Sequence, residues 1–417
     1  MLRTSLIRAA SLGWLFTAGL ARAQTDEPQG ATVSVGTGGI AIRSGGGNVQ
    51  LKFGLDLQLD GRFYLEASNA SETDPFLVRR ARPAFSGTLY KYVDFYVRPD
   101  FGLGQTIVYE SYIDFKYFSR FVVRAGKFKP PVGLERLQSD DDTNFIERGL
   151  PTLLVPSRDI GYQVSGDVIK HRVNYAVGVF DGVADNSLPD AGASSGKDYA
   201  ARLFLTPFHG TAHPEAKNPL YGLGLGVAAT SGAEDGLPLP SYKTLGQVTF
   251  FHFNSGVAPA GHRTRLAPQL SYYVGPFGLL AEFTRAEESF QKDNLRRPVA
   301  FRAWQVQAAY VLTGENKGFT SPVPRRSFNP AHGGWGALEL AIRMGDFAAN
   351  QAVFDSGFAN ITKSPRRAHE WLGAVSWYLN RNLRVSFNAG NTNFAGGAAA
   401  GDRPAERTLL SRLQVSF

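Results

Sequence analysis

The chain of 417 residues contains no cysteine and only two methionines. Without cysteine there can be no disulfide, no thiolate metal site and no cysteine nucleophile. There is also no long apolar run after residue 23, and the mean hydropathy is −0.17, which excludes a protein that crosses a membrane with helices. Yet 43% of the residues are hydrophobic and 12% are aromatic. The chain is therefore rich in apolar residues although its sequence shows little helical periodicity.

The N-terminus has the pattern of an export signal. Arg3 and Arg8 form a positive region, residues 9–20 form a short apolar core, and residues 21–23 form a small-x-small cleavage site. Because the core is too short to anchor the chain in a bilayer, we expect residues 1–23 to be a signal peptide that is removed. Its loss lowers the formal net charge from +8 to +5. Without a run of lysines and arginines, we expect no nucleic-acid partner.

Apolar and polar residues alternate along the first long segment of the mature chain. One face carries Leu51, Phe53, Leu55, Leu57, Leu59, Phe63 and Leu65, interrupted by Gly61, and the other carries Lys52, Asp56, Gln58, Asp60, Arg62, Tyr64 and Glu66. In water a strand of this length would be prone to aggregation. The wall of a transmembrane barrel, with lipid outside and water inside, explains the same pattern.

The alternation recurs to the end of the chain, where Leu409, Leu413, Val415 and Phe417 share one face. A closing strand that ends at an aromatic residue is typical of outer-membrane barrels, although an edge strand of a soluble sandwich has the same local pattern. About seventeen segments show the period, and bacterial single-chain barrels have an even number of strands. We therefore predict an all-β, antiparallel transmembrane barrel of about sixteen strands, with 14–18 as the range. One segment near 240–254 or 197–230 is then miscounted.

Polar stretches between the segments fall into two length classes. Short ones at 275–276 and 380–382 are predicted to be periplasmic turns. The longer ones are predicted to be extracellular loops: 181–197, 230–241, 314–334, 345–367 and 389–405. Residues 24–48 have two short apolar runs around glycines, so we expect a small periplasmic hairpin or lead-in there and a barrel over 49–417. A glycine-rich phosphate cradle is the alternative, but no helix follows the glycines.

Several stretches resemble the phosphate-selective porin O and P family. They are residues 39–44 leading into 51–65, then 78–82, 124–131, 144–148, 158–161 and 175–182, with 124–182 the most specific run. The resemblance implies a trimeric porin of sixteen strands in the bacterial outer membrane, in some members selective for phosphate or other anions. It also implies outer-membrane lipid and lipopolysaccharide as surroundings.

The strand phases predict which arginines face the lumen. If Leu77, Ala81 and Phe85 face lipid, then Arg80 and Arg82 point inward, and Arg79 is out of phase, at the membrane interface or near a turn. The same test places Arg62, Arg98 and Arg124 inward. These five inward arginines within the first five strands predict a track for phosphate-like anions, because the guanidinium is always charged and matches oxyanions with a planar fork.

Inward acidic residues support a different interpretation. The phases also place Asp56, Asp60, Asp94, Asp100, Glu110 and Asp114 in the lumen. Charges of both signs that pair across strands would give a weakly selective, general diffusion porin. The net charge of the mature chain does not decide between the two.

The connection 130–157 follows the fifth predicted strand and is the candidate constriction loop. Its charged residues include Glu135, Arg136, Glu147 and Arg148, with Lys127 and Lys129 just before it. Through the family resemblance, Arg79, Arg80, Arg124, Lys127 and Lys129 are candidate anion-binding residues. The acidic run 140–142 is either a solvated turn or a site for a divalent cation that bridges lipopolysaccharide.

The His-Glu-x-x-His motif of zinc hydrolases does not occur in the sequence. Residues 222–226, Gly-Leu-Gly-Leu-Gly, are not followed by a helix and are predicted to be a strand with glycines on one face. His209 and His213 lack an obvious third ligand, so we predict a surface loop and no metal site or cofactor. Two other classes stay open at this point: an outer-membrane hydrolase whose triad leaves no local motif, and a structural or adhesive barrel.

Overall fold

The protein is described by a computed structural model that covers residues 30–65, 73–118, 120–189, 196–209, 218–233 and 235–417. The predicted signal peptide, 1–23, lies outside these residues. Within them, no helix is long and apolar enough to cross a membrane.

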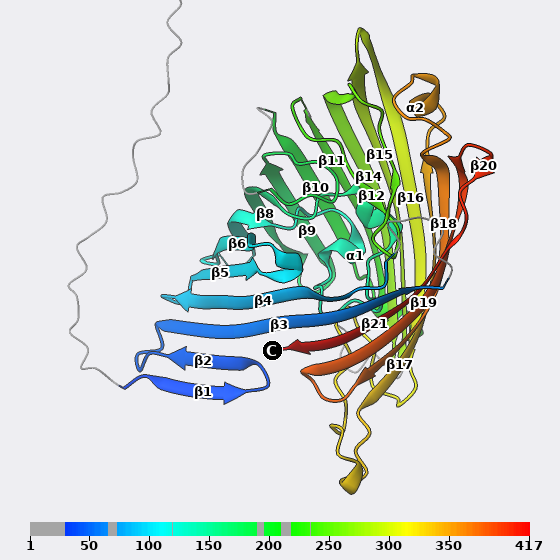
Figure 1. The fold of residues 1–417 in the computed structure, drawn as a ribbon. Coiled ribbons are helices and arrows are strands. Elements are labelled where there is room, and N and C mark those ends of the chain that lie inside the picture. Colours follow the sequence, from blue (N-terminus) through cyan, green and yellow to red (C-terminus); the bar gives the residue numbers. More distant parts are fainter. Residues whose placement is uncertain (1–29, 66–72, 119, 190–195, 210–217, 234) are drawn as a thin grey trace, which may run out of the picture.

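Sixteen of the strands in the described residues pair antiparallel with their neighbours in chain order and close into a barrel (Figure 1). The wall strands are β3 (Val49–Tyr64), β4 (Phe76–Leu89), β5 (Val93–Asp100), β6 (Ile107–Phe115), β7 (Val122–Phe128), β8 (Asp159–Ile169), β9 (Val173–Phe180), β10 (Asp198–Leu205), β11 (Leu223–Ala233), β14 (Ala258–Val274), β15 (Phe277–Lys292), β16 (Leu295–Val311), β17 (Ala337–Ala349), β18 (Pro365–Tyr378), β19 (Leu383–Ala398) and β21 (Glu406–Ser416). The last strand, β21, pairs with the first, β3, so the wall has no open seam. The predicted fold class and strand number are confirmed.

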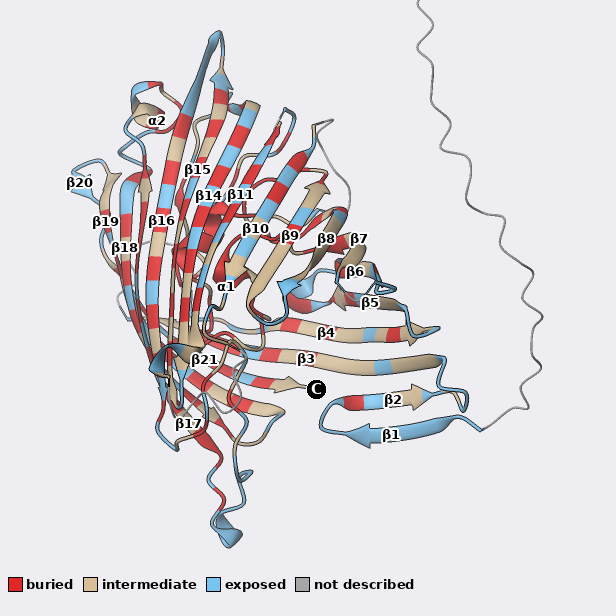
Figure 2. Cartoon of the chain, turned by 180° about the vertical axis from the view of Figure 1, so that it is seen from behind, coloured by how far each residue is buried: buried red, intermediate tan, exposed pale blue. Residues whose placement is uncertain are grey.

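Alternation along each strand separates the two faces of the wall. Buried residues alternate with exposed or half-buried ones along β14, β15 and β16 (Figure 2). On β16, for example, Ala303 and Gln305 are buried on the lumen side, whereas Val306 and Tyr310 are exposed on the outer side. This is the arrangement that a wall between lipid and a polar lumen requires.

The connections define two ends of the barrel. The turns at 275–276 and 379–382 and the C-terminus lie at one end, which we call the turn end, and the opposite end we call the loop end. In outer-membrane barrels the short turns face the periplasm. The stretches 181–197, 230–241, 345–367 and 389–405 include connections at the loop end, although wall strands extend into them.

The long stretch 314–334 is a correction to the prediction. It joins β16 to β17 at the turn end, where the Lys317 amide donates to the carbonyl of Gly275 and the Phe328 amide to that of Leu379. It was assigned to the extracellular side by its length alone, but strand direction, not length, decides the end at which a connection lies. It contains the short 3₁₀ helix η4 (Pro330–His332).

Before the barrel, β1 (Thr32–Gly36) and β2 (Gly39–Arg43) form an antiparallel hairpin. Strand β2 pairs with residues 50–53 of β3, and β21 pairs with residues 56–64 of the same strand. Figure 1 shows the hairpin beside β3, close to the C-terminus.

A β-bulge in β4 changes the phase that the alternation predicts. Gln58 pairs with Arg80, but the next residue, Leu59, pairs with Val78, so Arg79 is the extra residue. The residues before the bulge therefore swap faces. Phe76 and Val78 are exposed on the outer wall, and Leu77, which was expected to face lipid, lies opposite the buried Asp60.

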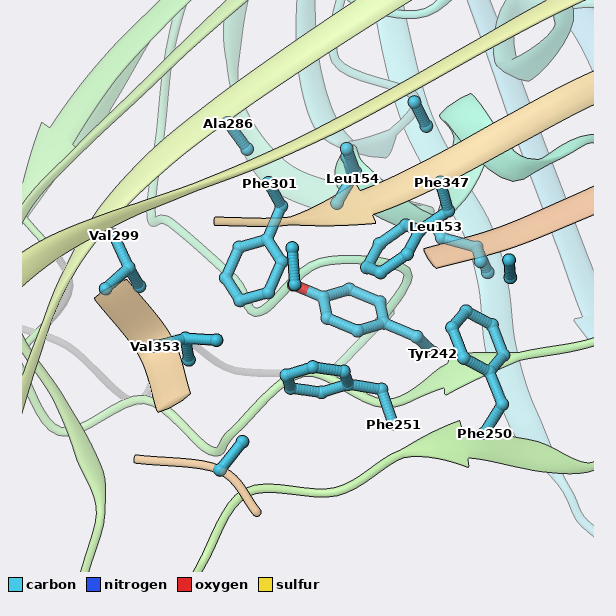
Figure 3. Close-up of a cluster of buried hydrophobic side chains, with 14 of the residues drawn as sticks. Leu153, Leu154, Tyr242, Phe250, Phe251, Ala286, Val299, Phe301, Phe347 and Val353 are labelled. Atoms are coloured by element: carbon cyan, nitrogen blue, oxygen red, sulfur yellow. The ribbon is translucent and has the colours of Figure 1, made fainter. Parts of the chain in front are cut away.

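The connection between β11 and β14 folds into the mouth of the barrel at the loop end. It carries the small hairpin of β12 (Tyr242–Lys243) and β13 (Thr249–Phe251), so the segment near 240–254 is the one that was miscounted as wall. Figure 3 shows Tyr242 and Phe251 packed beside Phe301 and Phe347 of the wall. The ring centroid of Tyr242 lies 5.3 Å from that of Phe301 and 4.9 Å from that of Phe347. This aromatic core also contains Leu150, Leu153 and Leu154. Part of the mouth is therefore filled by packed side chains.

Five short helices lie outside the wall strands in the described residues besides η4. They are η1 (Gly102–Gly104), α1 (Leu134–Leu137), η2 (Leu150–Leu154), η3 (Pro219–Gly222) and α2 (Ala352–Asp355), and the two-residue strand β20 (Gly401–Asp402) extends β19 at the loop end. Both α1 and η2 belong to the connection between β7 and β8.

Candidate functional site: the constriction and the lumen wall

The connection between β7 and β8 folds into the lumen and reaches the opposite wall. Oε2 of Glu282 on β15 accepts a hydrogen bond of 2.5 Å from the Leu134 amide. Arg343 on β17 donates to the carbonyl of Glu147, and Arg384 on β19 donates to that of Thr143, at 2.9 Å and 3.0 Å. These contacts span the barrel, so the loop occupies the lumen as the constriction that the sequence predicted.

Asp140 lies at the centre of the constriction loop. Its side chain is buried and forms ion pairs with Arg82 at 2.6 Å, with Arg148 at 2.7 Å and with Arg158 at 3.6 Å. Burial raises the pKa of Asp140, but the surrounding guanidinium groups outweigh it and hold the pKa well below the usual value. Both earlier interpretations of the acidic run are therefore wrong for this residue, which is neither solvated nor on the outer surface.

Tyr109 on β6 connects the same groups. Its hydroxyl donates a 2.6 Å hydrogen bond to Asp140. The guanidinium carbons of Arg82 and Arg158 lie 3.4 Å and 3.9 Å from its ring centroid. The ring therefore contacts two cations while its hydroxyl contacts their shared carboxylate.

Glu147 forms a second junction between the wall and the loop. It pairs with Arg62 of β3 at 3.1 Å and with the bulge residue Arg79 of β4 at 2.8 Å. The expectation that Arg79 lies at the membrane interface is thus wrong, because the bulge directs it into the lumen. Burial raises the pKa of Glu147, but the charges of Arg79 and Arg62 and the hydrogen bond from Arg79 hold it well below its usual value.

Two other predicted arginines pair with acidic residues of the wall. Arg98 lies 2.8 Å from Asp56, and Arg124 forms two hydrogen bonds of 2.7 Å to Asp114. Arg124 also lies over the ring of Tyr112 on the neighbouring strand, 3.8 Å from its centroid. Strand-to-strand charge pairing of this kind is what the weakly selective interpretation predicts.

The two predicted lysines contact backbone carbonyls. Lys127 donates to the carbonyl of Leu188 at 2.8 Å, and Lys129 donates to that of Gln138 at 2.6 Å. Burial and the nearby charges of Arg158 and Arg148 lower the pKa of Lys129 well below its usual value. Lys129 therefore positions the constriction loop.

The remaining predicted loop residues hold the loop together. Glu135 is fully buried, accepts from the Gly149 amide at 2.8 Å and lies 3.6 Å from Arg343. Arg136 donates to the carbonyl of Thr152 and to Asn186 at 2.6 Å and 2.7 Å. Burial and the charges of Arg148 and Arg158 lower the pKa of Arg136 to about 10, so it stays protonated at neutral pH.

Arg80 differs from its neighbours because it forms no ion pair with a described carboxylate. It is buried and donates to Oε1 of Gln58 on β3. Its Nε has no hydrogen-bond acceptor among the described protein groups. The charge of Arg80 is therefore the least compensated of the predicted track.

A cavity of about 290 Å³ lies between the constriction loop and the wall strands β4 to β6. Its ionisable lining consists of Arg79, Arg80, Arg82, Arg136, Arg148, Lys243, Asp100, Asp140, Glu147 and Glu370. Towards the loop end, a second cavity of about 420 Å³ is lined by Arg62 and Lys243 and by no described carboxylate. In both cavities the cations outnumber the carboxylates.

The sequence analysis did not identify four residues of this site: Asp140, Arg158, Tyr109 and Lys243. It assigned Asp140 to a solvated turn or a cation site. Arg158 precedes β8, and Lys243 lies on the inward-folded hairpin, so neither falls on a strand whose phase could be read. By alternation alone Tyr109 falls on the apolar face of its segment, but β6 pairs with β5 through a shift after Arg98, and the residue is buried. A one-residue shift reverses the face of everything beyond it.

The described residues contain no group of three or more histidine, aspartate or glutamate side chains that could hold a metal ion. His209 stacks on Tyr221, with 4.7 Å between ring centroids, and His213 lies outside the described residues.

A closed barrel of sixteen strands, narrowed by an inward-folded loop, defines a porin. The model of the family "Phosphate-selective porin O and P" matches residues 48–417, and the chain belongs to this family. Porin O of Pseudomonas aeruginosa is 24% identical over 91% of this chain and 93% of that protein. The protein is accordingly an outer-membrane porin of a bacterium, as the sequence predicted.

Solved structures share the fold at low sequence identity. The outer-membrane channel DcaP of Acinetobacter baumannii has a TM-score of 0.59 and 9% identity, covering 90% of this chain and 99% of that chain. An anion-selective porin from Comamonas acidovorans has a TM-score of 0.55 and 11% identity, covering 88% and 100%.

Proposed function

We propose that this porin conducts small anions in preference to cations and that phosphate-like oxyanions bind beside its constriction loop. The carrying observation is the excess of cations in the cavity there, where six basic residues face four carboxylates. A narrow lumen lined mainly by one sign of charge favours permeant ions of the opposite sign. The family and the anion selectivity of the Comamonas acidovorans porin agree with this proposal.

Arg80 is the residue best placed to bind an anion. The acidic partners of Arg79, Arg82 and Arg148 already neutralise much of their charge, whereas Arg80 forms no ion pair with a described carboxylate and donates its hydrogen bond to the neutral amide of Gln58. Its guanidinium borders the cavity, and its planar fork can bind two oxygens of a phosphate at once. The neighbouring charges raise the local potential, and Arg80 supplies the direct contact.

A weakly selective diffusion porin is the second candidate. Ion pairs with the wall residues Asp100, Asp56 and Asp114 favour it, because they compensate three of the five predicted arginines, Arg82, Arg98 and Arg124. The two proposals differ in what happens at low phosphate concentration. A selective site is occupied and blocks the chloride current, whereas a merely polarised wall is not.

The deciding experiment is the zero-current potential of the purified protein in a planar bilayer under a KCl gradient, repeated with added phosphate. We expect a potential close to that of chloride and a current that phosphate blocks. Arg80→Gln should raise the half-blocking phosphate concentration about tenfold or more, as expected for a lost hydrogen bond to a charged group. A potential near zero without block would leave only the weakly selective porin.

Arg285→Gln provides the matched control for charge. Arg285 lies on the outer face of β15, and its side chain is more than half exposed. The same loss of one positive charge there should leave the phosphate block unchanged. If both variants weaken the block equally, the effect comes from net charge and not from a site at Arg80.

We also propose that the protein forms a homotrimer, which the family membership implies. Cross-linking and light scattering of the detergent-extracted protein test this independently of its selectivity.

A further inference from the structure

The glycines at 222–226 shape the lumen wall at the turn end of the barrel. Leu225 and Val227 of β11 are exposed on the outer wall, so Gly224 and Gly226 face the lumen. A Cβ atom on either glycine would collide with the ring of Phe204 on the neighbouring strand β10. The glycines therefore let this ring lie flat against the wall, where larger side chains would fill the space.

A cavity of about 730 Å³ lies over this glycine-lined part of the wall. Its aromatic lining comes from Phe204, Tyr221, Tyr273 and Phe319, and Leu134 of the constriction loop contributes an apolar side chain. The volume lies in the range of about 300–1,000 Å³ that is usual for small-molecule sites, which are likewise mostly apolar with few polar groups. We call this space the aromatic chamber.

Arg202 on β10 borders the aromatic chamber. Its Nε donates to Gln269 at 2.9 Å, and its guanidinium carbon lies 4.5 Å from the ring centroid of Phe204. It forms no ion pair with a described carboxylate. The other basic residue of the chamber, Lys317, is compensated by Glu339 at 2.9 Å. Of the arginine and lysine residues described in the chamber lining, Arg202 is thus the one without an ion pair.

Arg202 also borders a second cavity, of about 340 Å³, which is polar. Arg124, Gln163 and Ser165 line it, with Glu110 as its one carboxylate among the described lining residues. Arg202 therefore stands between a polar, positively charged space and an apolar, aromatic one. A ligand that contacts both must carry a negative group and an aromatic ring.

We propose that the aromatic chamber is a binding site for aromatic carboxylates on the turn-end side of the constriction. The carboxylate pairs with Arg202, and the ring lies against Phe204 and near Tyr273 over the glycine-lined wall. Inorganic phosphate has no apolar surface to pack against the aromatic lining. An uncharged aromatic ligand has no negative group to pair with Arg202. The inference goes beyond the proposed phosphate site, because it concerns another part of the lumen and a different class of anion.

Saturation-transfer difference NMR of benzoate with the full-length protein in detergent tests the site, since the method detects weak ligands. We expect wild-type protein to transfer saturation to the benzoate ring. Arg202→Gln should weaken the apparent affinity about tenfold or more, the loss expected for a charge-assisted hydrogen bond. Phe204→Leu keeps the charge and should weaken it about twofold to tenfold, through the lost ring contact.

Arg285→Gln in the same detergent is the matched control and should bind benzoate like the wild type. Benzyl alcohol, which has the ring without the charge, should receive little saturation. Equal transfer to benzoate with wild type, Arg202→Gln and Phe204→Leu would overturn the proposal, because it would show partition into the micelle. Equal transfer to benzyl alcohol and benzoate would overturn the role of Arg202.

The phosphate block of the current distinguishes this inference from the proposed function. Arg202→Gln should lose benzoate binding and keep the phosphate block, and Arg80→Gln should do the reverse. A wild type that binds benzoate but is not blocked by phosphate would refute only the phosphate site. A wild type that is blocked by phosphate but binds no benzoate would refute only the aromatic chamber.

Discussion

Nε of Arg79 lies 2.8 Å from Oε1 of Glu147, so the extra residue of a wall strand holds the constriction loop in place. The contact depends on the bulge in β4, which directs Arg79 and Arg80 into the lumen together. Arg79 thereby anchors the loop, and Arg80 is the residue that we propose contacts a permeating anion.

Glu147→Gln should make the channel more anion-selective. The substitution keeps the size of the side chain but leaves Arg62 and Arg79 without their shared carboxylate. One negative charge removed at a few ångströms through water should change the chloride-to-potassium permeability ratio up to about fivefold. Zero-current potentials measure this ratio, and a shift towards potassium would contradict the assignment of Glu147 to the lumen.

The anchoring of the loop should resist mild acid. The pKa values of Asp140 and Glu147 are depressed in the folded protein, so their ion pairs contribute fully above the unfolded pKa values of about 3.9 and 4.3. The contribution is lost only as the pH falls through the lower, folded values. Unfolding midpoints in detergent should therefore change little on account of these groups between pH 7 and pH 5 and fall in stronger acid. Asp140→Asn should flatten the fall, whereas a fall that starts near pH 6 and vanishes in this variant would mean that the pKa is not depressed.

Tyr109→Phe should destabilise the constriction by about 1.5–3 kcal/mol, the usual contribution of a hydrogen bond to a charged group. It removes the donor to Asp140 and keeps the ring between Arg82 and Arg158. Tyr109→Leu should cost more, because the two cation–ring contacts are lost as well. Denaturant unfolding of the two variants separates the hydroxyl from the ring. Equal stability of both variants would show that the ring contacts contribute nothing.

Phe251→Ala should widen the mouth of the barrel and cost about 3–5 kcal/mol, as is usual for a buried phenylalanine. Its ring is buried between the inward-folded hairpin and Phe301 of the wall. Loosening the hairpin should raise the single-channel conductance, measured in planar bilayers. Phe76→Ala makes the same change on the outer wall, where the side chain is 80% exposed, and should leave the conductance unchanged.

The wall could be predicted from sequence because its pattern is local. Alternation along β3 and β16 reports which residues face lipid, and closure with an even number of strands restricts the count. The same alternation predicts that Arg62, Arg80, Arg82, Arg98 and Arg124 face the lumen, and in the structure each of these side chains is buried or half-buried. The constriction loop could be predicted as well, from its length and its position after the fifth strand.

The interior could not be predicted because its pairing is not local. Arg79 changes face through a bulge that is defined only by its partner strand β3. Asp140 sits in an acidic run that looks solvated, yet its partners come from β4, from the start of β8 and from within the loop. The stretch 249–253 has the composition of a wall strand, and only its packing against other wall strands shows that it is inside.

The hairpin of β1 and β2 has a consequence for assembly. It pairs with residues 50–53 of β3, on the same edge where β21 pairs with residues 56–64 and where the amide of Phe417 donates to the carbonyl of Leu55. If β21 slid along β3 towards residues 50–53, it would meet positions that already pair with β2. A shift of the pairing by one residue would also turn the apolar side chains of β21 into the lumen. The hairpin is thus a register stop for β21, built from residues that precede the wall.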